Sequence, residues 1–253
     1  MDDRDVALRI FEATLARSEE EFFDIAGVGA AFILIPVFDW LGIPFREAMA
    51  VALLLNSIAM IFASRTYIRY KLVVFRTAIP ILIIATLLSP VGAYTNQFFP
   101  IYILKWLFVG FLVFAGTMML FYKPKVRDEE ISPVRATGYG VGVGSAAGYL
   151  GGLLGIGGGN FIVPVLVWLG FDPKKASATT SFIVIFSSFS GFLGHATFGS
   201  VNLPLLAFAS VGSIVGAIVG AHLMTRRLES AQVKKIIGWI LYGIAVKMAW
   251  GLL

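Results

Sequence analysis

The chain lacks cysteine altogether, contains two histidines, and has charged side chains at 14% of its 253 positions. The absence of cysteine excludes disulfides, thiolate metal sites and cysteine nucleophiles. Soluble domains carry charge at about 25% of their positions, so the low charge argues against a soluble globular protein. What the sequence has instead is apolar residues, at 58% of positions, and a mean hydropathy of +0.86. This composition is typical of a protein that crosses a lipid bilayer several times.

The sequence repeats itself at a constant offset of 128 residues. The matching residues include Gly27 and Gly155, Pro36 and Pro164, Trp40 and Trp168, and Gly42 and Gly170. Self-similarity at a fixed offset indicates a duplicated structural unit. The most charged stretch of the chain separates the two copies. The sequence therefore predicts a first half over 1–121, a charged cytoplasmic linker over 122–133, and a second half over 134–253.

Each half contains one short apolar piece and three long apolar runs. The long runs are 48–64, 73–94, 101–121, 176–194, 203–224 and 236–253. They approach or exceed the ~17–25 residues that a membrane span needs. The short pieces, 32–41 and 161–169, would form rods of about 15 Å, half of a ~30 Å hydrocarbon core. Such a piece must begin or end inside the membrane, where open backbone is tolerated only if protein buries it or it lines a cavity.

The basic residues gather in four clusters between these runs. They lie at Arg65, Arg69, Lys71 and Arg76, at Lys123, Lys125, Arg127 and Arg135, at Lys174 and Lys175, and at Arg226, Arg227, Lys234 and Lys235. The positive-inside rule puts all four clusters in the cytoplasm. This requires the short piece of each half to form a re-entrant hairpin with the segment before it, which is 6–23 in the first half and 134–154 in the second. Each half then crosses the membrane three times. Because three is an odd number, the second half starts on the opposite side from the first, and the two halves must be inverted.

The predicted fold is thus an all-α polytopic membrane protein with two inverted structural repeats. Each repeat has a re-entrant or broken helix hairpin followed by three transmembrane helices. Inverted repeats with broken helices are an architecture of secondary transporters, whose binding site lies near the midplane where the repeats meet.

A glycine cluster precedes the short piece of the second half, over Gly155, Gly157, Gly158, Gly159 and Asn160. Glycine permits φ > 0 and lets peptide N–H groups approach a ligand closely. Free N–H groups at a helix start, with about half a positive charge, form an anion site. That half charge is worth roughly 2 kcal/mol for a monoanion at ~4 Å. From the residues alone, a tight turn with close helix contact explains the glycines equally well.

The second copy of the motif resembles the signature of a known family. Gly155-Ile-Gly-Gly-Gly-Asn-Phe-Ile-Val-Pro164, then Leu169-Gly-Phe-Asp-Pro-Lys-Lys-Ala-Ser-Ala-Thr-Thr-Ser181, is similar to that of the TauE/SafE family of sulfite and organosulfonate exporters. Residues 195–201 and the small-residue run 212–220 fit it as well, so the resemblance covers essentially the whole chain. It implies a permease of a prokaryotic inner membrane that moves small sulfur oxyanions or sulfonates, such as sulfite, sulfoacetate or taurine-derived compounds, without ATP hydrolysis.

The first copy departs from this motif, because Ala30 and Ala31 stand where the second copy has glycines. Polar side chains within apolar runs are further candidates, since they usually face the interior of a helix bundle. The residues expected to contact the anion are Gly155, Gly157, Gly158, Gly159, Asn160, Gly27, Gly29, Ala30, Asn56, Thr179, Thr180 and Ser181. The three hydroxyls at 179–181 have an alternative role, bonding to their own or a neighbouring helix.

His195, Asp39 and Asp24 are the candidates for proton coupling. Histidine titrates near physiological pH, and the two aspartates are the acids that flank the first hairpin. For His195 the competing explanation is a structural histidine bonded to water or backbone.

These observations predict a secondary transporter that moves a small sulfur-containing anion by alternating access. The alternatives are an anion channel of the same fold and a permease for a small anion without sulfur. An intramembrane enzyme ranks last, because the sequence offers no paired catalytic groups. We expect no catalytic residue, no metal and no cofactor. The expected partners are the lipid bilayer and the anion, and a homodimer is left open. Nucleic acid is not expected despite the net charge of +5, because the basic residues are scattered among short loops.

Overall fold

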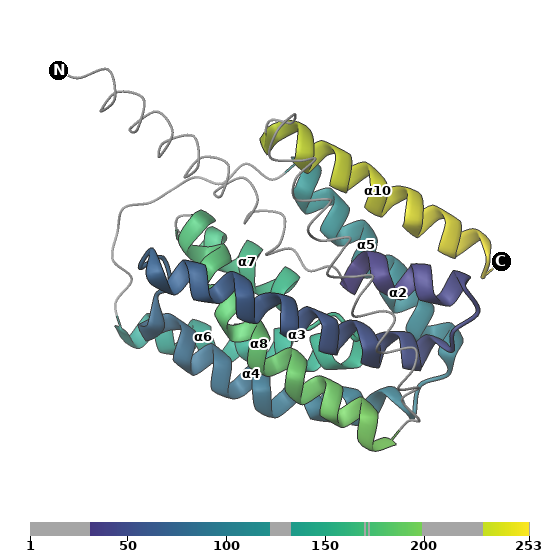
Figure 1. Ribbon diagram of the computed structural model, residues 1–253, viewed down its shortest axis with the longest axis horizontal. Helices are drawn as coiled ribbons and strands as arrows, with labels where there is room; N and C mark the ends of the chain where they lie inside the picture. The colour runs from purple at the N-terminus through teal and green to yellow at the C-terminus, as the bar shows by residue number, and fades with distance from the viewer. Residues whose placement is uncertain (1–30, 122–132, 170, 172, 199–229, 253) are drawn as a thin grey trace.

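The computed structural model describes residues 31–121, 133–169, 171, 173–198 and 230–252, and the regular elements in these ranges are helices (Figure 1). The helices are α2 (Ala31–Trp40), α3 (Phe45–Arg69), α4 (Phe75–Asn96), α5 (Ile101–Phe121), α6 (Pro133–Leu154), α7 (Gly159–Trp168), α8 (Pro173–Phe198) and α10 (Ser230–Trp250). Two of them have 10 residues, and the other six have 21 to 26. The described part of the chain therefore confirms the predicted all-α class.

Four of the described helices contain a stretch that is long and apolar enough to cross a membrane. These stretches are Phe45–Arg69, Phe75–Asn96, Ile101–Met118 and Lys175–Thr197. They coincide with four of the six predicted runs, which confirms the prediction of a polytopic membrane protein. The run 203–224 lies outside the described residues. The run 236–253 falls largely on α10, which is not among the four.

The helix boundaries recur at the offset of the sequence repeat. Helix α7 begins and ends 128 residues after α2, and α8 begins 128 residues after α3. Each half thus has a 10-residue helix that leads directly into a long one. Residues 1–30 and 199–229 lie outside the described residues, so the inverted relation of the complete halves and the division at 121 and 134 stay predictions.

Helices α4 and α6 lie side by side and run in the same direction. A Cβ on Gly144 would lie 3.0 Å from the carbonyl oxygen of Ile81, and one on Gly148 would lie 2.6 Å from the Cα of Ala85. Both residue numbers rise together along this contact, so the helices are parallel. The helix backbones touch because the facing residues of α6 are glycines.

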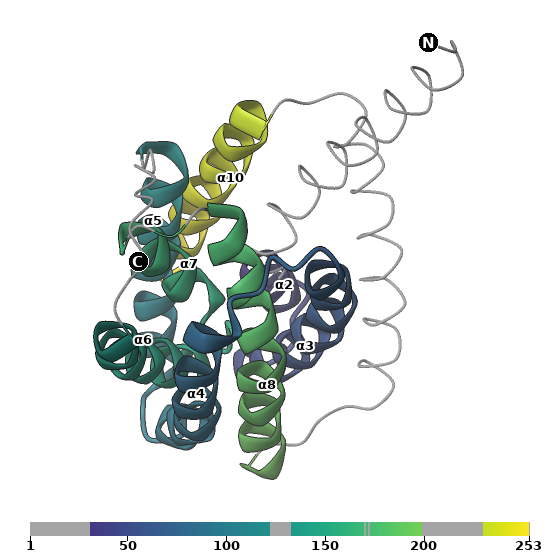
Figure 2. The ribbon, with the colours of Figure 1, turned by 90° about the vertical axis from the view of Figure 1, so that its left-hand side faces the viewer.

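Helix α8 packs on the other side of α4 and is also parallel to it. The Thr179 hydroxyl accepts a hydrogen bond from the Val74 amide (3.0 Å), and Ser190 Oγ donates to the Thr86 carbonyl further along (2.9 Å). Helix α3 runs the opposite way, since its residue 56 bonds to residue 188 while Tyr67 packs near Ala178. Figure 2 shows α6, α4, α8 and α3 following one another across the lower part of the molecule, with α5 and α10 paired above.

One end of this bundle therefore holds the end of α3 and the beginnings of α4, α6 and α8. We call it the basic end, after its side chains Arg65, Arg69, Lys71, Arg76 and Lys175. Because α6 leaves the basic end and α8 starts there again, the chain from α6 through α7 returns to the end at which it began. Ile162 and Leu166 of α7 pack in a buried cluster with Ile81 of α4, so the returning helix α7 lies against the bundle. The turn between α6 and α7 is thereby placed inside the bundle.

Candidate anion-binding site

The turn between α6 and α7 is made of glycines in the left-handed conformation. Gly155, Gly157 and Gly158 have φ of +71°, +74° and +75°, a region that side chains with a Cβ rarely adopt. Gly155 ends α6 in the manner of a Schellman motif, with the Ile156 amide donating to the Gly151 carbonyl (2.9 Å). The Gly157 amide donates to the same carbonyl (3.3 Å). These two amides are therefore satisfied within the turn. Fewer backbone N–H groups are free to bind an anion than the sequence predicts.

The amino end of α7 is buried and retains free amides. The Gly158 carbonyl accepts from the Phe161 and Ile162 amides (3.1 and 3.3 Å), which makes Gly158 the N-cap residue of α7. Within the described residues, the amides of Gly158 and Gly159 donate to no carbonyl or side chain. Both glycines are buried. An amino-terminal helix end with open amides and about half a positive charge is therefore enclosed by protein.

A group of polar side chains meets the turn at Gly157. Asn56 Nδ2 donates to Ser188 Oγ (3.1 Å), and Ser187 Oγ donates to the Gly157 carbonyl (3.1 Å). A Cβ on Gly157 would overlap Ser188 Oγ and approach Asn56 Nδ2 to 2.8 Å, so the absent side chain makes this meeting possible. We call Gly157, Asn56, Ser187 and Ser188 the central polar cluster. Asn56 is the twelfth of the 25 residues of α3, which puts the cluster about halfway along the helix.

Three buried polar atoms at this depth have no hydrogen-bond partner in the described part of the chain. They are Asn56 Oδ1, Thr86 Oγ1 and Ser89 Oγ, and the side chains of Asn56 and Ser89 are 2% and 1% exposed. Ser89 lies on α4, with its Oγ 2.5 Å from where a Cβ on Gly191 of α8 would be. An unsatisfied buried polar group costs about 1–3 kcal/mol, so such groups are normally paired with a ligand or water. These unpaired atoms make the interior around the cluster a candidate place for a ligand or water.

The cluster carries no charge of its own. Helix α3 has no charged residue between Glu47 and Arg65, and α8 has none between Lys175 and His195. Among the described residues, no group of three or more His, Asp or Glu side chains gathers to hold a metal ion. The donors at this depth are therefore neutral amides and hydroxyls.

The hydroxyl run at 179–181 does not meet the cluster. Thr179 Oγ1 accepts from the Val74 amide (3.0 Å) just before α4, and Ser181 Oγ donates to the Ser177 carbonyl of its own helix (3.0 Å). Thr180 Oγ1 is buried without a partner among the described residues. All three lie toward the basic end, at least six residues before Ser187. Thr179 and Ser181 thus have structural partners, and only Thr180 retains an unoccupied hydroxyl.

The proton-coupling candidates also lie away from the cluster. Asp39 Oδ2 pairs with Lys105 Nζ at 2.8 Å near the end of α2, where the two side chains are 18% and 24% exposed. His195 lies near the end of α8 with Nε2 2.8 Å from the Gly152 carbonyl. Asp24, Gly27, Gly29 and Ala30 lie outside the described residues, as does the side chain of Asn160.

Three of the last four carbonyls of α6 are each satisfied by a different group. Gly151 accepts from the turn, Gly152 from His195, and Leu153 from Asn96 Nδ2 (2.7 Å). Asn96 ends α4, and its Oδ1 accepts from Arg46 Nε (3.0 Å). Helix ends leave four carbonyls without helical partners, so these contacts tie the tip of the α6–α7 hairpin to the ends of α4 and α8.

Sequence reasoning missed Ser187, Ser188, Ser89 and Asn96. The signal that singled out Asn56 was a polar side chain inside a long apolar run. Ser187 and Ser188 in 176–194 and Ser89 in 73–94 carry the same signal. Asn96 lies just beyond its run, so its role depends on the position of α6 and has no comparable signal in the sequence.

The comparison with protein families agrees with the geometry. A family model described as "Sulfite exporter TauE/SafE" matches residues 22–248. The chain belongs to the TauE/SafE family. The match covers most of both halves, so the resemblance carried by the glycine motif extends over most of this TauE/SafE chain.

Several curated proteins are similar to this TauE/SafE chain. The probable membrane transporter protein YunE of Bacillus subtilis is 26% identical over 234 residues, which is 81% of this chain and 85% of YunE. A probable membrane transporter protein of Methanocaldococcus jannaschii is 27% identical over 77% of this chain and 78% of its own length. Sulfite exporter TauE/SafE family protein 1 of Arabidopsis thaliana is 32% identical, over 41% of this chain and 22% of the plant protein. No solved structure gives a significant match.

The contact of His195 with α6 yields a test of its role. We expect His195→Gln to retain transport and its pH profile, because a glutamine amide can donate to the Gly152 carbonyl in place of Nε2. His195→Leu leaves that carbonyl unpaired, at about 1–3 kcal/mol, and is expected to lower the melting temperature of the purified protein. A Gln variant that is stable but has lost the pH dependence of transport would instead assign proton coupling to His195.

Proposed function

We propose that this TauE/SafE chain is a secondary transporter that moves small sulfur-containing anions, such as sulfite or organosulfonates, by alternating access. The observation that carries the proposal is the buried amino end of α7, with free amides at Gly158 and Gly159, beside the neutral central polar cluster. Family membership supports a transporter, and the Arabidopsis relatives are named as sulfite exporters. We also propose that the chain lies in the inner membrane.

The donors around the turn suit an oxyanion. An anion with several oxygens can accept from the α7 amides and from side chains at the same time. The Asn56 Oδ1 is buried and has no partner among the described residues. Turning the Asn56 carboxamide over exchanges Oδ1 and Nδ2, so that Oδ1 accepts from the Ser188 hydroxyl and an N–H becomes free for the ligand. Hydrogen bonds to a charged ligand are worth about 1.5–3 kcal/mol each, enough to offset part of the dehydration of a small anion.

In this proposal the α6–α7 hairpin is re-entrant, and the basic end faces the cytoplasm. Positive charge marks cytoplasmic loops, and a backbone turn at mid-depth is tolerated because protein surrounds it. In this proposal Tyr67, Val73 and Ala178, which pack together, close the central polar cluster from the basic end. The bonds of Asn96 and His195 to α6 would close it from the opposite end. Alternating access requires these two closures to open in turn.

The decisive experiment is a binding screen on the purified protein with sulfite, thiosulfate, sulfate, sulfoacetate, taurine and acetate. We expect sulfite or sulfoacetate to bind measurably in titration calorimetry and acetate to bind weakly. In reconstituted vesicles, sulfite flux should saturate and should be accelerated by sulfite on the far side. Absence of any sulfite or sulfonate affinity would refute the substrate class. Flux that rises linearly with concentration would indicate a channel, and preference for acetate would indicate a permease for anions without sulfur.

A further inference from the structure

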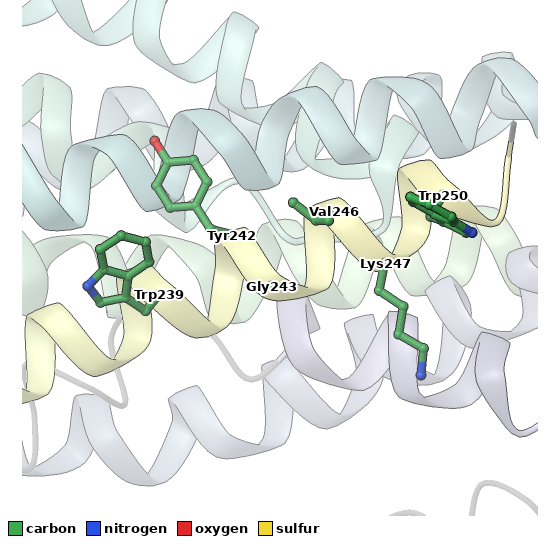
Figure 3. A pocket seen from close by; sticks show the side chains of 6 residues that line it. All are labelled: Trp239, Tyr242, Gly243, Val246, Lys247 and Trp250. Carbon is green, nitrogen blue, oxygen red and sulfur yellow. The ribbon is translucent and has the colours of Figure 1, made fainter.

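The outer face of α10 carries a shallow apolar hollow of about 490 Å³. It is lined by Trp239, Tyr242, Gly243, Val246, Lys247 and Trp250, which recur along one side of the helix (Figure 3). Trp239, Val246 and Trp250 are 68%, 64% and 81% exposed. A Cβ on Gly243 would meet nothing within 4 Å, so bare backbone forms the floor between the larger side chains.

A cation without a carboxylate partner lies at one end of this hollow. Lys247, in the last turn of α10, has its Nζ 3.8 Å from the centre of the Trp40 ring of α2. Nearby Lys105 pairs with Asp39, whereas Lys247 forms no ion pair in the described part of the chain. Figure 3 shows the Lys247 side chain leaving α10 toward α2, beside Trp250. Tryptophan and lysine at a helix end are characteristic of the headgroup level of a bilayer.

We propose that this face of α10 binds an anionic phospholipid. The lipid phosphate would lie on Lys247, and one acyl chain would lie over Gly243 between Trp239 and Val246. An acyl chain matches the apolar lining, and the lipid phosphate provides a negative counter-charge for the Lys247 ammonium group. A second copy of the chain fits this face less well, because burying Lys247 in a dimer would desolvate its charge without a described carboxylate to pair with it.

The test is native mass spectrometry of the full chain in detergent with phosphatidylglycerol or phosphatidylcholine. We expect phosphatidylglycerol to be retained at least 5-fold more than phosphatidylcholine. Lys247→Gln should remove this preference, and Lys247→Arg should restore it. Gly243→Leu, which fills the hollow, should lower retention of both lipids. Gly110→Leu on α5 is the matched control, since a Cβ there also meets nothing within 4 Å, and should change neither.

Unchanged phosphatidylglycerol retention in both Lys247→Gln and Gly243→Leu, at unchanged melting temperature, would overturn the proposal. So would a mass of two chains that Gly243→Leu reduces to one, because the face would then bind a second copy. Gly243→Ala, a smaller change in the same open space, serves as a second variant if the leucine variant is recovered poorly. Sulfite binding should be unaffected by Lys247→Gln, so this proposal and the proposed function fail independently.

Discussion

Replacing Asn56 by leucine is expected to weaken sulfite binding by about 10- to 100-fold without lowering the stability of the protein. The substitution removes the only side-chain carboxamide among the four residues of the central polar cluster, and one hydrogen bond to a charged ligand is worth about 1.5–3 kcal/mol. Stability should change little, because the substitution removes both a buried oxygen without a partner and the hydrogen bond that Asn56 Nδ2 donates to Ser188 Oγ. Titration calorimetry with sulfite and the unfolding midpoint in detergent measure the two effects.

The neighbouring residue Ser57 is the matched control for Asn56. Its Oγ donates to the Ile185 carbonyl of α8 at 2.9 Å, and its side chain is 2% exposed. Ser57→Ala should retain sulfite binding and lower stability by about 1 kcal/mol, the value of a typical hydrogen bond. Asn56→Leu is thus expected to lose sulfite affinity and keep its stability, whereas Ser57→Ala is expected to keep sulfite affinity and lose stability. Wild-type affinity in Asn56→Leu would show that the anion does not bind at the cluster.

Replacing Gly148 by leucine is expected to have the largest effect on stability. Its Cβ would lie 2.6 Å from the Cα and 2.7 Å from the carbonyl oxygen of Ala85, and backbone cannot yield as a flexible side chain can. Helices α4 and α6 would have to separate, which we expect to cost about 4 kcal/mol or more, the range of severe substitutions. The fraction of monodisperse protein in size-exclusion chromatography and the melting temperature measure this loss.

Gly142 lies on the same helix and provides the comparison. A Cβ there would meet nothing within 4 Å, so Gly142→Leu changes helix propensity and side-chain size without disturbing the contact with α4. We expect its stability to equal or slightly exceed that of the original protein, since leucine favours helix over glycine. Equal behaviour of the two leucine variants would contradict the direct backbone contact between α4 and α6.

Hydropathy and the internal repeat were sufficient to place the helices, but not their ends. The short pieces predicted at 32–41 and 161–169 correspond to Ala31–Trp40 and Gly159–Trp168. The long run predicted at 176–194 is the apolar part of Pro173–Phe198. Apolar content reports how much of a helix suits lipid, whereas helix ends depend on local features such as a proline in the first turn. The middle of a span is therefore more predictable than its boundary.

The candidate site was predictable where the signal was local. An amide inside an apolar run singled out Asn56, and closely spaced glycines indicated a turn with positive φ. For Thr179 and His195 the sequence left a ligand role and a structural role open, because their partners, Val74 and Gly152, are 105 and 43 residues away. A hydroxyl or imidazole looks the same in a sequence whether it meets a ligand or a distant backbone group. Only the packing of α4 beside α6 and α8 distinguishes these cases.

The neutrality of the central polar cluster has a consequence for energetics. Under the proposed function, the uncharged residues around Asn56 and Gly157 let the substrate-free carrier reorient without moving charge, and the loaded carrier moves the charge of its cargo. A membrane potential of 100 mV then acts on the loaded step with about 2.3 kcal/mol per elementary charge. With the cell interior negative, that work favours outward movement of a monoanion. The voltage alone would drive export, with no second ion and no nucleotide consumed.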